Sequence, residues 1–401
     1  MQSDVIILGG GLVGLTLALA LDAHGLTATI VDPADPAAVL APEFDGRASA
    51  IASASWRMLD AIGLGARLAG KGCPIASIRV SDGLAPGALD FEPAADDGAL
   101  GHMFENRALR QALHAAAAEA AGVTLLMPAR PVATERGADG VEVRLEDGRT
   151  LRAPLLVAAE GRQSPTRQAA GIQVARWSYD HVAIIAAVEH ERPHENIAYE
   201  IFYPEGPFAI LPMLPGTRSA LVWSVTRAQA PGYLKLGPRG FVAELARKMG
   251  GLLGDMRLIA PLSSYPLGFH HAARLTAERL ALVGDAGHGI HPIAGQGLNL
   301  GLRDAAALTE VLVDGARLGL DLGDAQLMKR YERWRSLDTF LIAASTDGLA
   351  RLFGIPGRPA AAVRRFGLSA VQRIAPLKNM FMAEARGESG DMPKLLTGVA
   401  V

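Results

Sequence analysis

Residues 291–304 read His-Pro-Ile-Ala-Gly-Gln-Gly-Leu-Asn-Leu-Gly-Leu-Arg-Asp and follow an apolar strand predicted at 280–283. The stretch places a proline and two glycines in a turn, directly before a helix that we predict from about Leu298 to Val313. A helix N-terminus carries free N–H groups and the positive end of the helix dipole. The stretch therefore predicts a site for a flat, partly anionic ligand.

A second ligand-binding turn is predicted at the start of the chain. Residues 5–8 are continuously apolar, as in a buried parallel strand, and a glycine-rich turn follows them. An apolar helix is expected from about Leu12 to His24, and Gly25 is a typical helix stop. A second strand is expected at 28–31. This order of strand, turn, helix and strand is that of a nucleotide-binding unit.

Four residues of this unit have distinct physical roles. Gly9 permits the tight turn, Gly11 lets the backbone approach a pyrophosphate, and Gly14 lets helix and strand pack closely. Asp32 ends the second strand, where its carboxylate can accept hydrogen bonds from ribose hydroxyls and repels a 2′-phosphate. The unit therefore favours FAD or NAD over NADP, against the alternative of a glycine-rich loop with no ligand.

Asp285 decides between the two dinucleotides. Gly284-Asp285 ends the late strand and places a carboxylate at the carboxyl edge of the sheet, where open α/β folds bind ligands. A carboxylate there suits the hydroxyls of a flavin ribityl chain, which NAD lacks. The alternative is a turn acid that caps a helix.

The histidines have simpler explanations. His288 and His291 lie in loops, where hydrogen bonding or packing is more common than catalysis, and the pair His270-His271 is expected to be structural or solvent-facing. No metal site is predicted, because further ligands at fixed spacing are missing.

Composition limits the class of protein. The chain has 401 residues, half of them hydrophobic, which indicates two or more domains. The net charge of −2 and the lack of a long basic block argue against nucleic acid as a partner. Cys73 is the only cysteine, which excludes an intrachain disulfide and fits a reducing, cytosolic setting. The apolar run 5–21 contains glycines and lacks a basic start, so it is read as strand and helix rather than a signal peptide or membrane span.

The pattern changes along the chain predict four segments. Residues 1–175 form the first part of the dinucleotide domain, with a strand near 76–101 that joins another sheet, and residues 276–330 return to complete it. Residues 176–275 form a substrate domain, because 197–225 contains alternating apolar runs typical of antiparallel sheet. Residues 331–401 form a C-terminal helical region that ends in a loose tail from 387.

These motifs resemble the flavoprotein aromatic hydroxylases of the p-hydroxybenzoate hydroxylase type, and most closely the UbiH-type monooxygenases of ubiquinone biosynthesis. The segment 291–304 matches that subfamily's signature throughout, and the resemblance extends to residues 45–48, to 206–212 and to 222–224. Two departures are Glu160, where the family usually has aspartate, and Gly287, where alanine is commoner. The motif of the related flavin halogenases is absent from the sequence.

The resemblance implies an α/β fold with a Rossmann-like FAD-binding domain of the p-hydroxybenzoate hydroxylase type, an antiparallel-sheet substrate domain and C-terminal helices. It also implies NAD(P)H and dioxygen as co-substrates and hydroxylation of a prenylated phenol through a flavin C4a-hydroperoxide. We expect the following placement: Gly9, Gly11, Gly14 and Asp32 at the adenosine end of FAD; Arg47, Asn106 and Arg110 near the pyrophosphate and ribityl region; Asp285 at the ribityl chain; Gly295, Gln296, Gly297 and Leu298 at the flavin ring; and Pro292 beside the substrate ring through its carbonyl. No side chain is predicted as the acid or base.

Three other functions stay open at this point. A catabolic phenol or aromatic acid hydroxylase would share these motifs, and so would a non-catalytic FAD-binding accessory of a quinone-biosynthesis complex. An NAD-dependent dehydrogenase would leave Gly284-Asp285 and the 291–304 stretch unexplained.

The last helices, predicted through 327–353 and 360–382, mix bases with apolar residues. The bases are Arg364, Arg365, Arg373 and Lys378. This surface predicts either peripheral contact with the inner membrane or ordinary packing on the FAD domain, and a lipid-soluble substrate favours the membrane.

Overall fold

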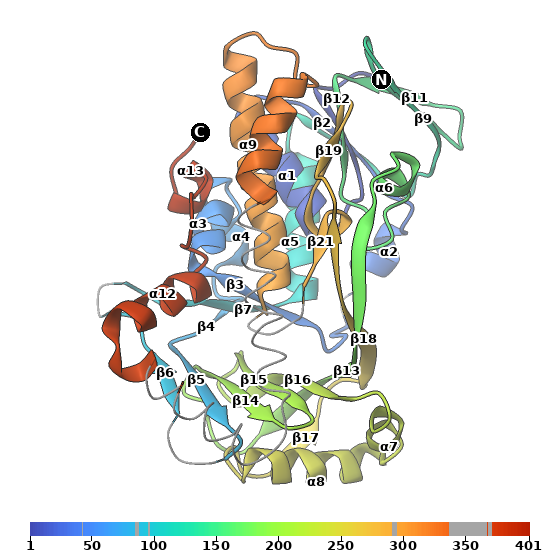
Figure 1. Cartoon of the computed structure of the whole chain (residues 1–401). Helices are drawn as coiled ribbons and strands as arrows, with labels where there is room; N and C mark the ends of the chain where they lie inside the picture. Colours follow the sequence, from blue (N-terminus) through green and yellow to red (C-terminus); the bar gives the residue numbers. More distant parts are fainter. Residues whose placement is uncertain (42, 85–87, 95–96, 291–294, 337–366, 368–370) are drawn as a thin grey trace.

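A mostly parallel sheet carries the two ligand-binding turns and forms the upper part of the molecule in Figure 1. The computed structural model describes residues 1–41, 43–84, 88–94, 97–290, 295–336, 367 and 371–401. Along this sheet the strands are β19 (Thr276–Ala277), β20 (Leu280–Leu282), β12 (Leu155–Ala158), β1 (Val5–Leu8), β2 (Ala28–Val31) and β8 (Val123–Leu126). All neighbours are parallel except β19 and β20. The strands predicted at 5–8 and 28–31 are confirmed, and the late strand ends one residue earlier than predicted.

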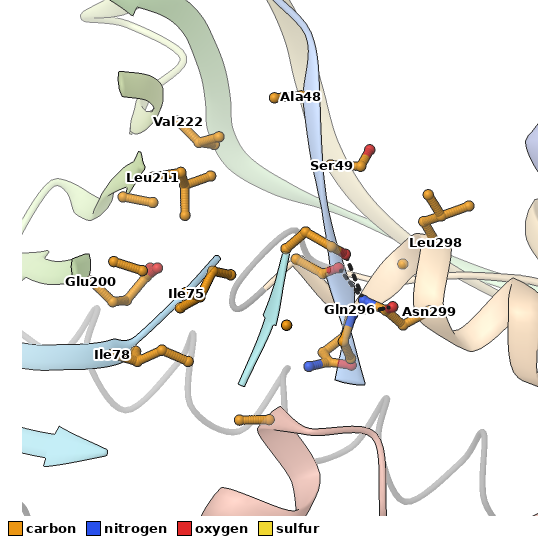
Figure 2. A pocket seen from close by; sticks show the side chains of 18 of the residues that line it. Ala48, Ser49, Ile75, Ile78, Glu200, Leu211, Val222, Gln296, Leu298 and Asn299 are labelled. Carbon is orange, nitrogen blue, oxygen red and sulfur yellow. Dashed lines mark hydrogen bonds between the residues drawn. The ribbon is translucent and has the colours of Figure 1, made fainter. Parts of the chain in front are cut away.

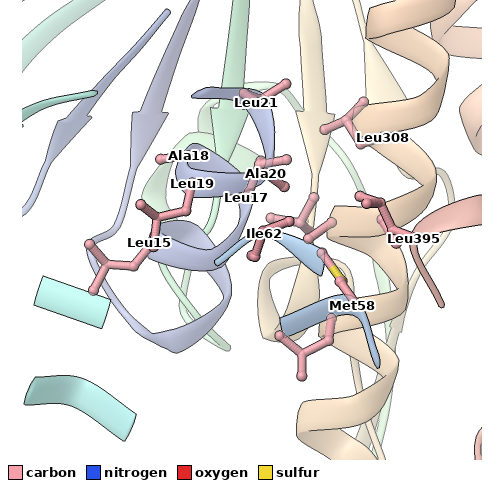
Figure 3. Close-up of a cluster of buried hydrophobic side chains, with 14 of the residues drawn as sticks. Leu15, Leu17, Ala18, Leu19, Ala20, Leu21, Met58, Ile62, Leu308 and Leu395 are labelled. Atoms are coloured by element: carbon pink, nitrogen blue, oxygen red, sulfur yellow. The ribbon is translucent and has the colours of Figure 1, made fainter. Parts of the chain in front are cut away.

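Both faces of the parallel sheet are covered, which explains why its strands are continuously apolar. Val5 and Ile7 pack against helices on one face, whereas Ile6 and Leu8 pack against a small antiparallel sheet on the other. The covering helices are α1 (Leu12–Asp22), α3 (Ser53–Ala61), α5 (Asn106–Glu119) and α9 (Gln296–Arg317). The covering sheet is β9 (Pro131–Gly137), β10 (Gly140–Leu145) and β11 (Thr150–Ala153). Figure 3 shows the leucines of α1 in one cluster with Leu308 of α9 in this core.

Smaller elements connect these layers. A third sheet joins strands from both sides of α3 and lies between the parallel sheet and the lower part of the molecule. Its strands are β3 (Ala48–Ala52), β7 (Gly101–Glu105) and β4 (Cys73–Pro74). The short helices are α2 (Pro36–Val39), α4 (Gly65–Leu68), α6 (Pro165–Ala169) and the 3-10 turn η1 (Gly284–Ala286).

A large sheet forms the lower part of the molecule, with α7 (Ala230–Leu234) and α8 (Gly237–Met249) beneath it in Figure 1. Its order is β21 (His288–Gly289), β18 (Ser263–Ala272), β13 (Val174–His190), β16 (Arg218–Thr226), β15 (Gly206–Met213), β14 (Ile197–Tyr203), β5 (Ser77–Asp82) and β6 (Leu89–Phe91), with β17 (Met256–Leu258) paired to β13. The antiparallel sheet predicted over 197–225 is confirmed. The strand predicted near 76–101 joins this sheet, and β5 runs parallel to β14.

The long strands β13 and β18 run between the two parts of the molecule (Figure 1). Their pairing spans Val174 with Ala272 at one end and Ile185 with Ser263 at the other. Because β21 also pairs with β18, the large sheet reaches the segment that follows β20. The pairing therefore connects the large sheet directly to the segment in which the flavin site is predicted.

The C-terminus corrects one expectation. The prediction of a loose tail from residue 387 is wrong, because α13 (Lys394–Thr397) packs against α3 and α9. Leu395 and Leu396 are fully buried in the helical core, where Figure 3 shows Leu395 facing Leu308 and Met58. The last residue is also held, since Arg317 donates to the Val401 carbonyl oxygen at 2.7 Å. Two apolar side chains gain enough by burial to order the end of the chain.

The helical region before this tail is described in part. Helix α12 (Ala375–Ala385) begins within the predicted span 360–382 and ends beyond it. Most of the two helices predicted at 327–353 and 360–382, with Arg364 and Arg365, falls outside the described residues. In the described part of the chain, no helix combines the length and apolar character needed to cross a membrane.

Candidate active site

The glycine turn after β1 requires glycine at two positions for steric reasons. Gly9 has φ of +110°, and a Cβ there would lie 2.4 Å from the Ala159 carbonyl oxygen. A Cβ on Gly14 would lie 2.0 Å from the Gly9 carbonyl oxygen, so α1 packs on the turn with no room for a side chain. Gly11 differs, because nothing lies within 4 Å of the position of its Cβ. The space in front of the α1 N-terminus is therefore open.

Asp32 lies beside this turn, at the end of β2. Its Oδ2 accepts a hydrogen bond from the Gly10 N–H at 2.6 Å, and its Oδ1 accepts one from the Ala34 N–H at 2.8 Å. A carboxylate has about four acceptor positions. These two backbone bonds fix its orientation and leave it able to accept hydrogen bonds from a ligand.

The start of α9 is held by a side chain that the sequence analysis did not assign. Gly295, with φ of +62°, is the N-cap residue and has no side chain to occupy the free N–H groups. Asn299 donates from Nδ2 to the Ala50 carbonyl oxygen at 2.9 Å and accepts from the Ala52 N–H at 2.9 Å (Figure 2). Asn299 thus fastens β3 to the first turn of α9, and its place one turn into the predicted helix was a signal for that role.

A cavity of about 1220 Å³ extends from these helix ends to the large sheet. It touches Val13 in the first turn of α1 and Gly297 in the first turn of α9, so both helix ends meet one space. Seven predicted site residues line it: Arg47, Asn106, Asp285, Gly295, Gln296, Gly297 and Leu298. Its other walls come from β3, from the inner face of the large sheet and from α12.

The remaining predicted residues lie elsewhere. Gly9, Gly11, Gly14 and Asp32 surround the first turn and are not among the residues that line this cavity. Arg110 donates to the Val39 carbonyl oxygen at 3.1 Å and pairs with Asp45 at 3.2 Å. Pro292, predicted beside the substrate ring, and His291 lie outside the described residues.

Asp285 and Arg162 form an ion pair on the cavity wall. Asp285 Oδ2 accepts from Arg162 Nε at 3.0 Å, and both side chains are partly exposed. Arg162 follows β12 and was not predicted as a site residue, although its glycine-flanked position after a parallel strand was a signal. The pair places one positive and one negative group at the carboxyl edge of the sheet, between β12 and β20.

Glu160 and Arg167 support this edge. Glu160, the departure from the family pattern, accepts from the Ser164 hydroxyl at 2.5 Å and from the Thr166 N–H at 3.2 Å, so it stabilises the start of α6. The Arg167 guanidinium is fully buried and donates to the carbonyl oxygens of Ala286 at 2.7 Å and Arg162 at 2.9 Å. Arg167 thereby holds together the two loops that carry Arg162 and Asp285.

The histidines near the site make structural hydrogen bonds. His288 is buried against Asp304, and His270 lies 2.8 Å from the Asp285 carbonyl oxygen. The expectation that His270 faces solvent is wrong, because the side chain is buried, whereas the structural alternative holds. Within the described ranges, no group of three metal-ligating side chains is found.

One further cavity residue was missed. Glu200 lies on β14, and its side chain points into the space lined by Ile75, Ile78 and Leu211 (Figure 2). The signal was a single charge at an inward-facing position of an alternating strand.

These features fit FAD. The open space before Gly11 and the uncapped start of α9 leave two sets of free backbone N–H groups on either side of one cavity. Two such ends suit the pyrophosphate and the electron-rich edge of a flavin, and the cavity exceeds the usual range of about 300–1,000 Å³ for one small ligand.

Comparison with known proteins agrees with this geometry. Residues 2–337 match the FAD binding domain family. The chain is 49% identical over 400 residues to the ubiquinone hydroxylase UbiL of Rhodospirillum rubrum, covering 99% of this chain and 93% of that protein. It is 34% identical to the 3-demethoxyubiquinol 3-hydroxylase of Escherichia coli, covering 96% and 98%.

A solved structure of low identity supports the fold alone. The p-nitrophenol 4-monooxygenase PnpA of Pseudomonas putida superimposes with a TM-score of 0.79 at 17% identity, covering 98% of this chain and 100% of that one. The family match over most of the chain and the two long alignments agree on one assignment. The chain therefore belongs to the family of FAD-dependent monooxygenases that carries this FAD binding domain and includes the hydroxylases of ubiquinone biosynthesis.

Proposed function

We propose that this protein is an FAD-dependent monooxygenase that hydroxylates the aromatic ring of a polyprenylated phenol in ubiquinone biosynthesis, with NAD(P)H as electron donor. The observation that carries the proposal is one cavity that begins at the two helix N-termini and ends in an apolar chamber on the inner face of the large sheet. The names of the relatives, a ubiquinone hydroxylase and a demethoxyubiquinol hydroxylase, point to the same substrate class.

FAD would be held at two separate places. Gly9, Gly11, Gly14 and Asp32 would hold the adenosine end, and Arg47, Asn106 and Arg110 would lie toward the pyrophosphate and ribityl region. Asp285 would accept from the ribityl hydroxyls, and the backbone N–H groups from Gly295 to Leu298 would face the flavin ring. When bound and reduced, FAD supplies the activation of dioxygen. The protein's part is to orient the ring and to exclude water.

The chamber on the inner face of the sheet supports a prenylated substrate. Its walls are aliphatic and aromatic side chains from five strands: Ile78, Val80, Phe91, Ala198, Phe202, Ala209, Leu211, Ala220 and Val222. Such walls bind a hydrocarbon tail by burial of apolar surface.

A catabolic hydroxylase of aromatic acids is the second candidate. A small aromatic acid would need a positive group in the chamber, yet Glu200 is the charged side chain on this face of the large sheet among the described residues. Its carboxyl group offers a carboxylate ligand no positive partner. The structure thus favours a neutral phenol.

The decisive experiment follows quinone precursors. In cells lacking this protein, mass spectrometry should show a prenylated phenol that lacks one ring hydroxyl, and the purified yellow protein should couple NAD(P)H oxidation to oxygen insertion into it. A protein that binds FAD but gives no hydroxylated product would be a non-catalytic accessory. Faster turnover of a small phenolic acid would support the catabolic alternative.

We also propose that α12 contacts the membrane surface. Ile374, the N-cap residue of α12, and Met380 within the helix are 50% and 57% exposed, and Arg373, just before the helix, is also exposed. Met380 and its neighbours on α12 also line the cavity. A helix that exposes apolar residues beside a basic one can lie on an anionic bilayer. Vesicles containing anionic lipid should bind the wild type more tightly than the double variant Ile374→Asp, Met380→Asp. The control Leu318→Asp removes a more exposed leucine at the end of α9 and should bind like the wild type.

A further inference from the structure

Glu200 faces the cavity because of the strict alternation of β14. Tyr199, Ile201 and Tyr203 pack toward α8 on the outer face of the large sheet. The residues between them, Ala198 and Phe202, belong to the apolar cluster on the cavity side. Glu200 shares their side of the strand and lines the cavity, opposite Gln296 and Asn299 at the start of α9 (Figure 2).

The strands beside Glu200 offer it no polar partner. Val80 on β5 is its aligned neighbour on one side and Ala209 on β15 on the other, and both are apolar. Among the described residues, none donates a hydrogen bond to its carboxyl group or forms an ion pair with it. The Glu200 side chain is half-buried and borders the cavity, so a ligand there is the partner open to its carboxyl group.

Burial sets the proton affinity of this group. It raises the pKa of Glu200 to about 8, and burial is the one cause. The other residues with charged or titratable side chains that border the cavity are Tyr199 on β14, Tyr265 on β18, Glu384 on α12, and Arg47, Arg162 and Asp285 in the segments between strands. Arg162 and Asp285 pair with each other, Glu384 accepts from Ser389, and burial raises the pKa of both tyrosines.

We propose that Glu200 is a catalytic residue that binds the ring hydroxyl of the phenol and takes its proton; this inference rests on the proposed function. An ordinary glutamate, with a pKa near 4.3, is a weak base toward a phenol with a pKa near 10. A base matched more closely to the phenol transfers the proton more effectively. Glu200 meets that requirement and lies on the wall that faces the start of α9.

The proton balance is simple. The phenol O–H bond breaks, an O–H bond forms on a Glu200 carboxylate oxygen, and the ring gains electron density as a phenolate. Dioxygen and NAD(P)H supply the oxygen atom and the electrons, and the second oxygen atom leaves as water. As the hydroxylated carbon loses its hydrogen as a proton and the ring regains aromaticity, Glu200 returns its proton to the ring oxygen.

The test compares Glu200→Gln and Glu200→Asp with the wild-type holoenzyme. Glu244→Gln, which removes the same charge from the exposed outer helix α8, is the matched control. Glu200→Gln keeps the shape and should retain FAD and thermal stability. Its kcat should fall on the order of 10²-fold, with KM changed much less, and the rise of kcat with pH near 8 should vanish. Glu200→Asp should restore part of the rate.

A second measurement needs no turnover. In infrared difference spectra of the oxidised enzyme, a protonated-carboxyl band should titrate near pH 8 and shift when an unreactive alkylphenol is added. The band should be absent from Glu200→Gln and present in Glu244→Gln. An unchanged kcat and pH profile in Glu200→Gln, or a band that ignores the phenol, would overturn the inference. A wild type that turns over no prenylated phenol, but whose band responds to alkylphenol, would instead overturn the proposed function.

Discussion

The imidazole Nε2 of His288 lies 2.5 Å from Oδ2 of Asp304, and both side chains are buried. The same carboxylate accepts from Arg335 Nε at 2.7 Å and from the Gly284 N–H at 2.9 Å. Asp304 lies on α9, whereas Gly284 and His288 flank the turn that carries Asp285. One carboxylate therefore fixes the position of that turn relative to α9.

Asp304→Asn should destabilise the protein strongly. The substitution leaves the Arg335 guanidinium buried without its counter-charge, and breaking a buried pair in this way typically costs about 3–5 kcal/mol. Urea unfolding of the FAD-loaded protein measures the loss. Asp314→Asn, which removes a partly exposed partner of Arg330, should cost less than about 1 kcal/mol. Equal losses from the two variants would contradict the role of Asp304.

The same group predicts a pH dependence of stability. Burial alone would raise the pKa of Asp304, but His288 and Arg335 lower it overall through charge and hydrogen bonds. Since the folded pKa lies below the unfolded value of about 3.9, the stabilisation is present above that value and is lost as pH falls through the folded pKa. The difference in unfolding free energy between wild type and Asp304→Asn should therefore be constant from pH 7 to 5 and shrink below about pH 4. A difference that grows on acidification would disprove this assignment.

Asp285→Ala should lower FAD retention. The carboxylate lies on the cavity wall with Arg162, and its removal takes away the proposed acceptor for the ribityl hydroxyls. The ratio of flavin to protein absorbance after gel filtration measures the effect, and free FAD in excess should restore part of it. Because the side chain is partly exposed, the thermal stability of the FAD-free protein should hardly change. Full flavin content in the variant would show that Asp285 does not hold the ribityl chain.

Two glycines of the first turn should behave differently. Gly14→Ala places a Cβ against the Gly9 carbonyl oxygen, so it should lower the FAD content. It should also lower the free energy of unfolding of the FAD-free protein by about 1–3 kcal/mol, and with it the melting temperature. Gly11→Ala meets no protein atom and should lower FAD content with a stability change within about 1 kcal/mol. Calorimetry with and without FAD separates these effects, and normal FAD binding by Gly11→Ala would argue against a pyrophosphate there.

Leu395→Ala should destabilise the protein although it lies only six positions before Val401. The side chain is fully buried against α3 and α9, and truncating a buried leucine typically costs about 2–5 kcal/mol. Val399→Ala, at a position that is 57% exposed, is the control and should cost little. Thermal melts of both variants compare them directly, and similar melting temperatures would mean that the C-terminal segment contributes nothing to the core.

The sequence predicted strands and turns correctly where the local residue pattern and the backbone geometry agree. The run 5–8, the glycines after it and Asp32 defined one unit, because glycine at Gly9 and Gly14 answers a steric requirement a few residues away. The alternation in 197–203 likewise predicted a strand with two faces. The prediction for the C-terminal tail was wrong because two adjacent leucines in a short segment give no periodic signal, and their burial depends on packing against distant helices.

The sequence by itself determined the class of ligand and the chemistry, since strand, turn and helix signals and a long signature act over short stretches of chain. The tertiary structure alone decided which residues share one space: that Val13 and Gly297 meet the same cavity, that Arg162 pairs with Asp285 across more than a hundred residues, and that Glu200 faces them from another sheet. The physical reason is that hydrogen bonds and burial between remote segments depend on how whole layers pack, and a linear pattern carries no record of that packing.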